Sequence, residues 1–128
     1  MDVICHGIDL VDCNRIQELL TKHGQRFLNR VFTATEQQYS QRHRYQIERL
    51  SGRFAVKEAV MKMLGTGWQS GIAWTDIEVV NDALGRPEVK LSGKVAELAK
   101  ELGIEQVSVS ITHTSGLAVA SAIALGNK

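Results

Sequence analysis

The stretch RFAVKEAVMK, residues 53–62, decides the fold, because it forms the centre of a helix predicted over about residues 46–64. Apolar residues recur at helical spacing from Ile47 to Leu64, and Glu58 stands at the step of this stripe where another apolar residue would be expected. We therefore expect Glu58 to point inward. An ionised carboxylate on a buried stripe is costly unless a cation receives it, so the chain should supply a base or a bound metal. An ordinary buried ion pair with Arg or Lys would serve as well.

Shorter elements are predicted before this helix. Gly7 allows close backbone approach in an opening strand, and Asp9 lies near the end of that strand. Asp12 suits the N-cap of the next helix, and Thr33 or Thr35 suits the N-cap of a later one. The predicted segments are a strand over residues 1–10 and helices over about residues 12–23, 27–31 and 36–41.

A helix and two pairs of strands are predicted after it. Residues 65–67, GTG, end the long helix, because glycine suits the left-handed position at a helix C-terminus. Residues 117–125 are nearly all apolar, so we expect the last strand to be buried on both faces. The predicted segments are strands over 77–80 and 89–91, a helix capped by Ser92 that ends at Gly103, and antiparallel strands over 107–112 and 117–125. This order indicates an α+β fold with an antiparallel sheet and a long central helix, in one domain over residues 1–128.

Composition and charge limit the class of protein. The hydrophobic content of 44% and the charged content of 23% are those of a soluble globular chain. The formal net charge is only +1, but residues 22–62 hold nine Lys or Arg against three Glu, which predicts a basic half-surface suited to phosphates or an acidic protein partner. A merely solvated face is the alternative. Because Met1 is followed by Asp2 and long uncharged apolar runs are lacking, we expect no signal peptide, no membrane span and a cytoplasmic protein.

A few residues have the chemistry of a phosphate-handling site. Asp9 and Glu58 offer the hard oxygen ligands that Mg²⁺ accepts while it keeps waters and takes substrate phosphate oxygens. Lys62, four residues after Glu58, projects from the same helix face and either reaches the same ligand or forms an ordinary salt bridge. His113 could donate to a phosphate, act as a base, or serve as a structural hydrogen-bonding residue. The best chemistry from these residues is Mg²⁺-assisted transfer of a phosphate or diphosphate group.

Several motifs in the right order make the match to a known family specific. The chain resembles holo-[acyl-carrier-protein] synthase, the small class of 4′-phosphopantetheinyl transferases. The motifs are GID at 7–9, RI at 15–16, RF at 26–27, RVFT at 30–33 with Glu36, GRFAVKEA at 52–59, GTG at 65–67 and SITHT at 110–114. The loop from Trp68 to Trp74 is more aromatic than the resemblance leads us to expect.

The resemblance implies an activity and an assembly. It implies transfer of the 4′-phosphopantetheine arm from coenzyme A to a serine of acyl carrier protein, with release of adenosine 3′,5′-bisphosphate, in a step of lipid metabolism. It implies a homotrimer with active sites between subunits. Asp9 and Glu58 would hold Mg²⁺ against the diphosphate. Glu58, directly or through water, is the first candidate base, and Lys62 would contact phosphate or act as an alternative base.

Further residues acquire roles from the same resemblance. Arg53, His113 and Thr114 would bind the phosphates of the nucleotide, and Gly65 and Gly67 would let the backbone approach it. Acyl carrier protein is acidic, so its docking residues are expected to be basic around one apolar contact. The matching positions are Arg15, Leu19, Lys22 and Arg26.

Two non-catalytic readings compete with the transferase. A nucleic-acid-binding domain would use the basic residues of 22–62 on phosphates, but Tyr39 and Tyr45 are the only stacking aromatics that we assign to it. A scaffold that merely binds acidic helices would tolerate Glu58→Gln. The nucleic-acid reading also leaves an inward Glu58 unexplained, and so we expect no nucleic-acid partner.

Overall fold

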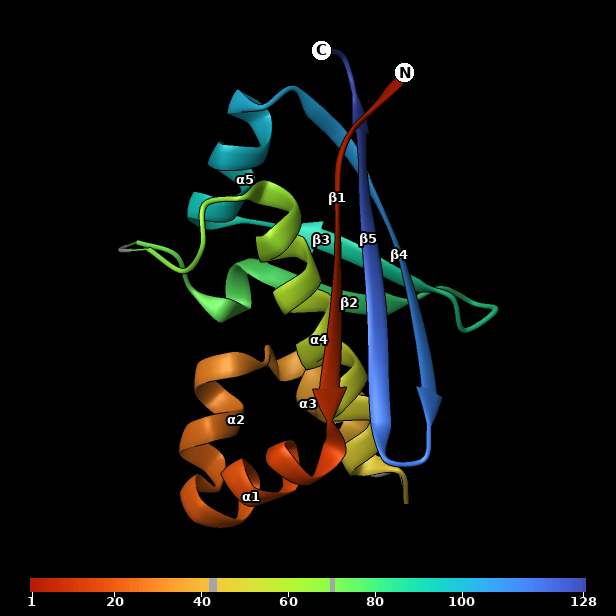
Figure 1. Ribbon diagram of the computed structural model, residues 1–128. Helices are drawn as coiled ribbons and strands as arrows, with labels where there is room; N and C mark the ends of the chain where they lie inside the picture. Colours follow the sequence, from red (N-terminus) through yellow and green to blue (C-terminus); the bar gives the residue numbers. More distant parts are fainter. Residues whose placement is uncertain (42–43, 70) are drawn as a thin grey trace.

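A three-stranded antiparallel sheet lies against one long helix, and this pairing organises the chain (Figure 1). The sheet has the order β1-β5-β4, formed by β1 (Asp2–Asp12), β5 (Leu117–Gly126) and β4 (Ile104–Thr114). The helix is α4 (Gln46–Leu64). The structure is a computed structural model and describes residues 1–41, 44–69 and 71–128. The predicted bounds of the central helix are confirmed, and the α+β class with them.

Small residues bring α4 unusually close to the sheet. Along β5 the inward side chains are Ala118, Ala120, Ala122 and Ala124, and each is fully buried. On β1, a Cβ atom at Gly7 would lie 2.2 Å from the carbonyl oxygen of Ala59. The predicted close approach at Gly7 is therefore confirmed, and it presses the inner face of β1 against the second half of α4.

The other elements gather at the two ends of α4. Near the end of β1 lie three short helices, α1 (Cys13–His23), α2 (Gln25–Val31) and α3 (Ala34–Gln41) (Figure 1). Towards the other end lie the short helix η1 (Trp74–Asp76), the hairpin of β2 (Ile77–Asn81) and β3 (Pro87–Leu91), and α5 (Gly93–Glu101). None of the described helices is long and apolar enough to cross a membrane.

Local caps fix several of these boundaries as predicted. The Asp12 carboxylate accepts a hydrogen bond of 2.9 Å from the backbone N–H of Asn14 at the start of α1. Thr33, rather than Thr35, caps α3, and it forms a reciprocal capping box with Glu36. Gly65 ends α4 at φ 74°, a left-handed conformation that costs glycine little.

The charges buried in α4 belong to Lys57 and Arg53, which corrects the prediction that Glu58 points inward. Lys57 is fully buried and its Nζ lies 2.9 Å from Oε1 of Glu36, which is also fully buried. Glu58 is only half-buried. Helical periodicity failed here because α4 is covered on nearly its whole circumference, so one apolar stripe does not define which residue faces the core.

The Lys57–Glu36 pair also joins four elements. Lys57 donates to the carbonyl oxygens of Trp74, at 3.1 Å, and Ile77. Glu36 accepts from the backbone N–H groups of Thr33 and Val79, each at 2.9 Å. All of these bonds satisfy charges that burial would otherwise penalise, and they fix η1 and β2 against α3 and α4.

The last strand is buried on one face only, so the prediction for it is wrong in the single chain. Inward alanines alternate with Val119 and Ile123, which are partly exposed, and Ile123 retains 39% of its surface. Helix α4 covers only the inner face of the sheet (Figure 1). On the outer face, Ile8 and Leu10 of the neighbouring β1 are exposed beside these β5 residues.

Candidate functional site

Asp9, Glu58 and Lys62 meet where β1 crosses α4. Asp9 follows Gly7 by two residues and so lies on the same inner face of β1. Lys62 Nζ lies 2.8 Å from Asp9 Oδ1 and donates to the carbonyl oxygen of Ile8 at 3.3 Å. Glu58 precedes Lys62 by one helical turn. The Lys62 side chain is 56% exposed and that of Asp9 only 13%, so the lysine lies over the acid at the surface.

The charges of this group act on one another. Burial is the main cause that raises the pKa of Glu58, and the negative charge of Asp9 raises it further. Hydrogen bonding by Trp68 and the positive charges of Arg15 and Lys62 act in the opposite direction and lower this pKa. The pKa of Lys62 is raised, first by its hydrogen bond to Asp9 and then by the Asp9 charge. Lys62 therefore pairs with Asp9 rather than forming the ordinary helix salt bridge with Glu58 that the sequence left open.

The group fits a hard divalent cation. The charges of Asp9 and Glu58 repel each other, and a cation bound between the two carboxylates would reduce this repulsion. Mg²⁺ is commonly held by one or two carboxylates plus waters and substrate phosphates. In the part of the chain that the structure describes, groups of three or more His, Cys, Asp or Glu with metal-binding geometry are not found. The donors present suit a cation whose coordination the substrate completes.

Arg53 and His113 lie in a different groove of about 450 Å³. Arg53 is 4% exposed, donates to Oδ1 of Asn81 at 2.5 Å and lies 4.2 Å from the ring centroid of Tyr39. Burial lowers the pKa of Arg53, and its Nε has no hydrogen-bond partner among the described residues. His113 Nε2 lies 2.9 Å from the carbonyl oxygen of Glu48. The residues that line this groove do not include Asp9 and its two partners.

The remaining nucleotide-binding candidates lie near the groove of His113 or near Lys62 of the acidic group. Thr114 is the exposed last residue of β4, directly after His113. Gly65 and Gly67 follow Lys62 in the loop after α4, with φ of 74° and 65°. A Cβ atom at either glycine would have no neighbour within 4 Å, so the backbone there is open on that side.

Three of the four predicted docking residues line a third groove, of about 410 Å³, between α1, α2 and α4. Its lining includes Arg15, Leu19 and Arg26, together with the aromatic residues Phe54 and Trp74. Lys22 is exposed but does not line the groove. Arg15 also lowers the pKa of Glu58 by its charge, so the docking groove adjoins the acidic group.

The basic residues of 22–62 do not form the single half-surface that the charge count predicted. Lys57 and Arg53 are buried, and Lys62 pairs with Asp9. Arg49 lies 4.3 Å from the ring centroid of Tyr39. Among the described residues, Lys22 of α1 and Arg26 and Arg30 of α2 keep their charge exposed near one another, whereas Arg53 and Lys57 have partners inside the fold.

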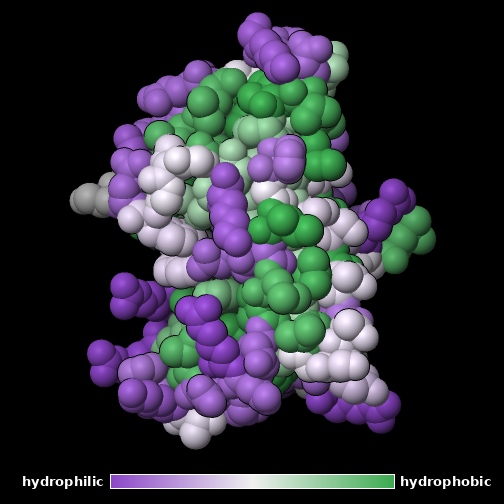
Figure 2. All heavy atoms as spheres, viewed as in Figure 1, coloured by the Kyte–Doolittle hydropathy of each residue, from purple (hydrophilic) through white to green (hydrophobic). Residues whose placement is uncertain are grey.

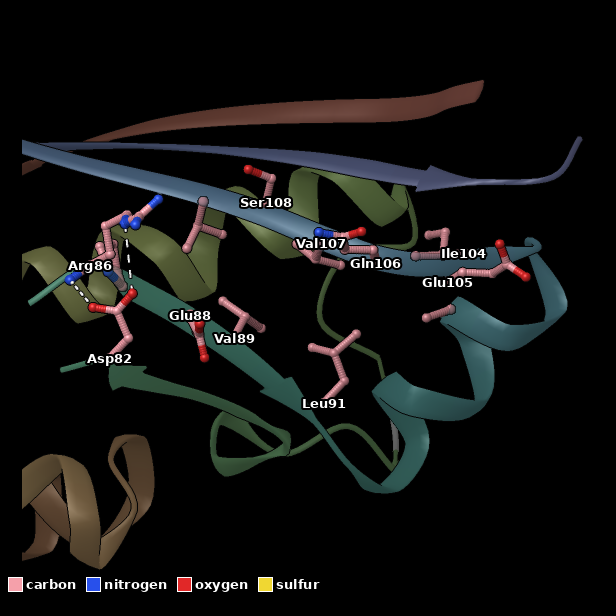
Figure 3. Close-up of a pocket in the computed structure, with 13 residues that line it drawn as sticks. Asp82, Arg86, Glu88, Val89, Leu91, Ile104, Glu105, Gln106, Val107 and Ser108 are labelled. Carbon is pink, nitrogen blue, oxygen red and sulfur yellow. Dashed lines mark hydrogen bonds and ion pairs between the residues drawn. The ribbon is translucent and has the colours of Figure 1, made fainter. Parts of the chain in front are cut away.

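A fourth groove, of about 560 Å³, separates the free edges of β3 and β4 and contains none of the predicted site residues (Figure 3). Apolar side chains such as Val89, Leu91 and Val107 line its interior, and Asp82 and Arg86 form an ion pair at one end. These residues carry no evident catalytic chemistry.

An aromatic stack of Phe54, Trp74 and Trp68 was not predicted from the sequence. The ring centroids of Trp68 and Trp74 lie 3.8 Å apart, and those of Trp74 and Phe54 lie 5.0 Å apart. The signal in the sequence was the pair of tryptophans in a loop next to the GTG motif, but the short helix that turns Trp74 towards α4 could not be foreseen from it.

Comparison with known proteins gives a consistent picture. Residues 6–120 match the model of the 4′-phosphopantetheinyl transferase superfamily. The chain is 40% identical over 121 residues to a holo-[acyl-carrier-protein] synthase of Solibacter usitatus, covering 94% of this chain and 97% of that protein. It is 44% identical over 117 residues to the synthase of Trichlorobacter lovleyi, covering 91% and 93%.

Solved structures show the same fold. The crystal structure of the synthase from Neisseria meningitidis matches with a TM-score of 0.88 at 31% identity, covering 97% of this chain and 99% of that one. The Helicobacter pylori synthase, solved in complex with coenzyme A, matches with a TM-score of 0.83 at 28% identity, covering 94% and 99%.

Proposed function

Because the chain belongs to the 4′-phosphopantetheinyl transferase superfamily, we propose that it transfers the 4′-phosphopantetheine group of coenzyme A to a serine of acyl carrier protein. The serine oxygen forms a bond to the phosphorus that carries the pantetheine arm, and the bond from that phosphorus to adenosine 3′,5′-bisphosphate breaks. The observation that supports this most directly is the meeting of Asp9, Glu58 and Lys62 at one point on the surface, beside a basic groove.

A magnesium ion belongs to this proposal. Asp9 and Glu58 would hold it, and when bound it would neutralise the diphosphate and make the bisphosphate a better leaving group. The mutual repulsion of the two carboxylates supports this assignment.

The side chains have separate tasks in the reaction. Glu58 would accept the serine proton, directly or through a water molecule, because its raised pKa makes it a stronger base than an ordinary carboxylate. Asp9 raises the pKa of Lys62, so Lys62 stays protonated near neutral pH and suits stabilisation of phosphate charge better than proton abstraction. This favours Glu58 over Lys62 as the base.

A complete site requires more than one copy of the chain in this proposal. The groove of Arg53 and His113, with Thr114 next to His113 in the chain, would bind nucleotide phosphates, yet its lining excludes the acidic group of the same chain. A homotrimer in which the groove of one subunit meets the acids of its neighbour accounts for that separation. Ile8 and Leu10 are 61% and 59% exposed, and Figure 2 shows hydrophobic residues gathered along the sheet, a surface that such an assembly would cover.

The carrier protein would dock on α1 and α2. Arg15 and Arg26 flank Leu19 around the groove that adjoins Glu58, and Lys22 adds an exposed charge nearby. Basic residues around an apolar contact suit an acidic helical partner. This placement brings the acceptor serine to the catalytic acids, and nucleic acid has no corresponding role.

The proposal is tested by incubating the protein with apo acyl carrier protein, coenzyme A and Mg²⁺, and measuring the mass of the carrier. We expect the carrier to gain the mass of one 4′-phosphopantetheine group, and a chelator to prevent the gain. The Ser→Ala variant of the carrier at its acceptor position is the matched control. An unchanged mass with a carrier that another transferase modifies would refute the proposal.

A further inference from the structure

The ring of Tyr39 in α3 has two guanidinium groups against it. The guanidinium carbon of Arg53 lies 4.2 Å from the ring centroid, and that of Arg49 lies 4.3 Å from it. Both distances are well within the about 6 Å over which the face of an aromatic ring attracts a cation. Arg49 and Arg53 are one turn apart on α4, so they share a helix face. The ring of Tyr39 therefore gathers two arginines of α4 at one point.

Hydrogen bonds fix the inner arginine of this pair. Nη2 of Arg53 donates to Oδ1 of Asn81 at 2.5 Å, and the Asn81 amide donates to the carbonyl oxygen of Gly85 at 2.9 Å. Nη1 of Arg53 donates to the backbone carbonyl oxygen of Arg49 at 3.5 Å. All of these acceptors are neutral. Among the residues that the structure describes, neither arginine forms an ion pair with a carboxylate, so their charges are not neutralised within the fold.

Two positive charges held side by side favour an anion between them. Like charges one turn apart on a helix repel each other. Burial lowers the pKa of Arg53 most, and the charge of Arg49 lowers it further. Arg53 is 4% exposed, and its Nε has no hydrogen-bond partner within the described ranges, although buried donors are normally paired. An anion bound beside the pair would accept from the arginines and reduce their repulsion.

We propose that Arg49 is a second phosphate-binding arginine, and that Tyr39 is the positioning residue that holds Arg49 and Arg53 together against its ring. The inference rests on the proposed transferase function, which gives this groove the phosphates of the nucleotide. Both arginines and Tyr39 line the groove, as does His113. The family resemblance assigned Arg53 to the nucleotide but gave no role to Arg49 or Tyr39. Two guanidinium groups that are already fixed lose little freedom when a phosphate binds, so the ring should increase affinity.

The role of Arg49 can be tested without any assay of activity. Isothermal titration calorimetry would measure the Kd of adenosine 3′,5′-bisphosphate. We expect Arg49→Ala to raise this Kd about tenfold, and Arg49→Lys to raise it less, because lysine keeps the charge but not the planar set of donors. Lys100→Ala removes a positive charge from the exposed surface of α5, outside the groove, so its Kd should stay within about twofold of the wild type. An unchanged Kd in Arg49→Ala would overturn the proposal.

The role of Tyr39 is tested by keeping or removing its ring. Tyr39→Phe keeps the ring, and its Kd should stay within about twofold of the wild type. Tyr39→Leu removes both cation contacts, and its Kd should rise about fivefold. In the Arg49→Ala background the same change to leucine should cost less, because only one arginine remains to be held. Equal losses in the two backgrounds, or a loss in Tyr39→Phe as large as in Tyr39→Leu, would overturn the positioning role.

Kinetics separate this inference from the proposed function. We expect Arg49→Ala to raise the KM for coenzyme A about tenfold with kcat within about twofold, because binding that is equal in the ground state and the transition state changes KM alone. A fall in kcat with an unchanged KM would contradict the assignment. If the wild type modifies the carrier and Arg49→Ala has unchanged kinetics, the arginine pair is wrong and the transferase stands. An inactive wild type would refute the transferase, and the role of the pair with it.

Discussion

Gly7 of β1 and Ala59 of α4 meet backbone to backbone, with space for a hydrogen but not for a methyl group between them. A Cβ atom at Gly7 would lie 2.2 Å from the Ala59 carbonyl oxygen and 2.7 Å from the backbone nitrogen of Met63. Both neighbours are backbone atoms, so they cannot move aside as a flexible side chain would. The contact lies within two residues of Asp9 and one residue of Glu58, so it sets the distance between the two acids.

Gly7→Ala should therefore destabilise the fold severely. We expect a loss of at least about 2 kcal/mol in the free energy of unfolding, measured by urea denaturation, because overpacking against backbone has no cheap relief. Gly85→Ala is the control: its φ is 86° but a Cβ there has no neighbour within 4 Å, so only the backbone penalty of about 1 kcal/mol applies. Equal losses in both variants would show that the contact between β1 and α4 is not as tight as described.

Glu58→Gln should abolish turnover and yet leave the metal-free protein as stable or more stable. The pKa of Glu58 is higher in the folded chain than in the unfolded chain, chiefly because of burial, so the folded chain holds more protons between those two pKa values and stability falls as pH rises through that interval. A neutral amide avoids this penalty. At pH 7, with a chelator present, we expect a rise of up to about 3 °C in Tm by calorimetry.

The pH dependence supplies the control for that prediction. Below about pH 4 the carboxylate is protonated in both states, so the difference in Tm between Glu58→Gln and the wild type should disappear. A variant that is markedly less stable than the wild type at pH 7 would contradict the assigned direction of the pKa shift.

Arg15→Ala should weaken docking more than chemistry. We expect the KM for acyl carrier protein to rise about tenfold with a smaller fall in kcat, and the difference from the wild type to shrink as salt is added. Lys22→Ala removes the same charge from an exposed residue outside the groove, so its KM should rise less. Equal effects of the two substitutions would mean that net charge, rather than the groove, attracts the carrier.

Lys57→Met should destabilise the chain by about 3–5 kcal/mol in urea denaturation, because it leaves the Glu36 carboxylate buried without its cation. Adding Glu36→Gln removes the stranded charge while an amide oxygen can still accept from the backbone of Val79. The double variant should therefore be more stable than Lys57→Met alone. Additive losses would contradict the coupling of the two residues.

Asp9→Asn and His113→Ala should complement each other if the sites lie between subunits. Each variant alone should be nearly inactive, but refolding an equal mixture should restore about a quarter of the wild-type activity. In such a mixture each half of a site comes from a subunit with that half intact in one case out of two, so about a quarter of the sites have both halves intact. Mixing Asp9→Asn with Glu58→Gln is the matched control. Both substitutions damage the same half of the site, so that mixture should stay inactive, and recovery there would argue against shared sites.

Much of the fold could be predicted from local sequence signals, because these signals act over only a few residues. The N-cap at Asp12, the glycine stop at Gly65 and the helical spacing from Ile47 to Leu64 predicted boundaries that the structure confirms. The burial of the last strand was not predictable in the same way. Whether Val119 and Ile123 are covered depends on what packs on the outer face, and hydropathy alone does not report that.

The site was predictable where adjacent residues share a helix and unpredictable where distant segments meet. Glu58 and Lys62 are one turn apart, so their common face follows from the sequence. The buried pair of Lys57 and Glu36 joins residues 21 positions apart, and nothing in the period of α4 distinguishes Lys57 from Glu58 as the buried charge. Lys57 of that pair donates to the Trp74 carbonyl oxygen, so the stack of Trp74 with Phe54 and Trp68 was equally hidden.

The row of alanines on β5 has a consequence for how this enzyme can diversify. Each methyl group sets the height at which α4 rests above the strand, and a larger side chain at Ala120 or Ala122 would lift the helix, and Glu58 with it, off Asp9. The scaffold therefore tolerates little variation at these positions. On the proposed docking of the carrier, adaptation to new carrier proteins would come from the surfaces of α1 and α2, which can change without altering the spacing of Asp9 and Glu58.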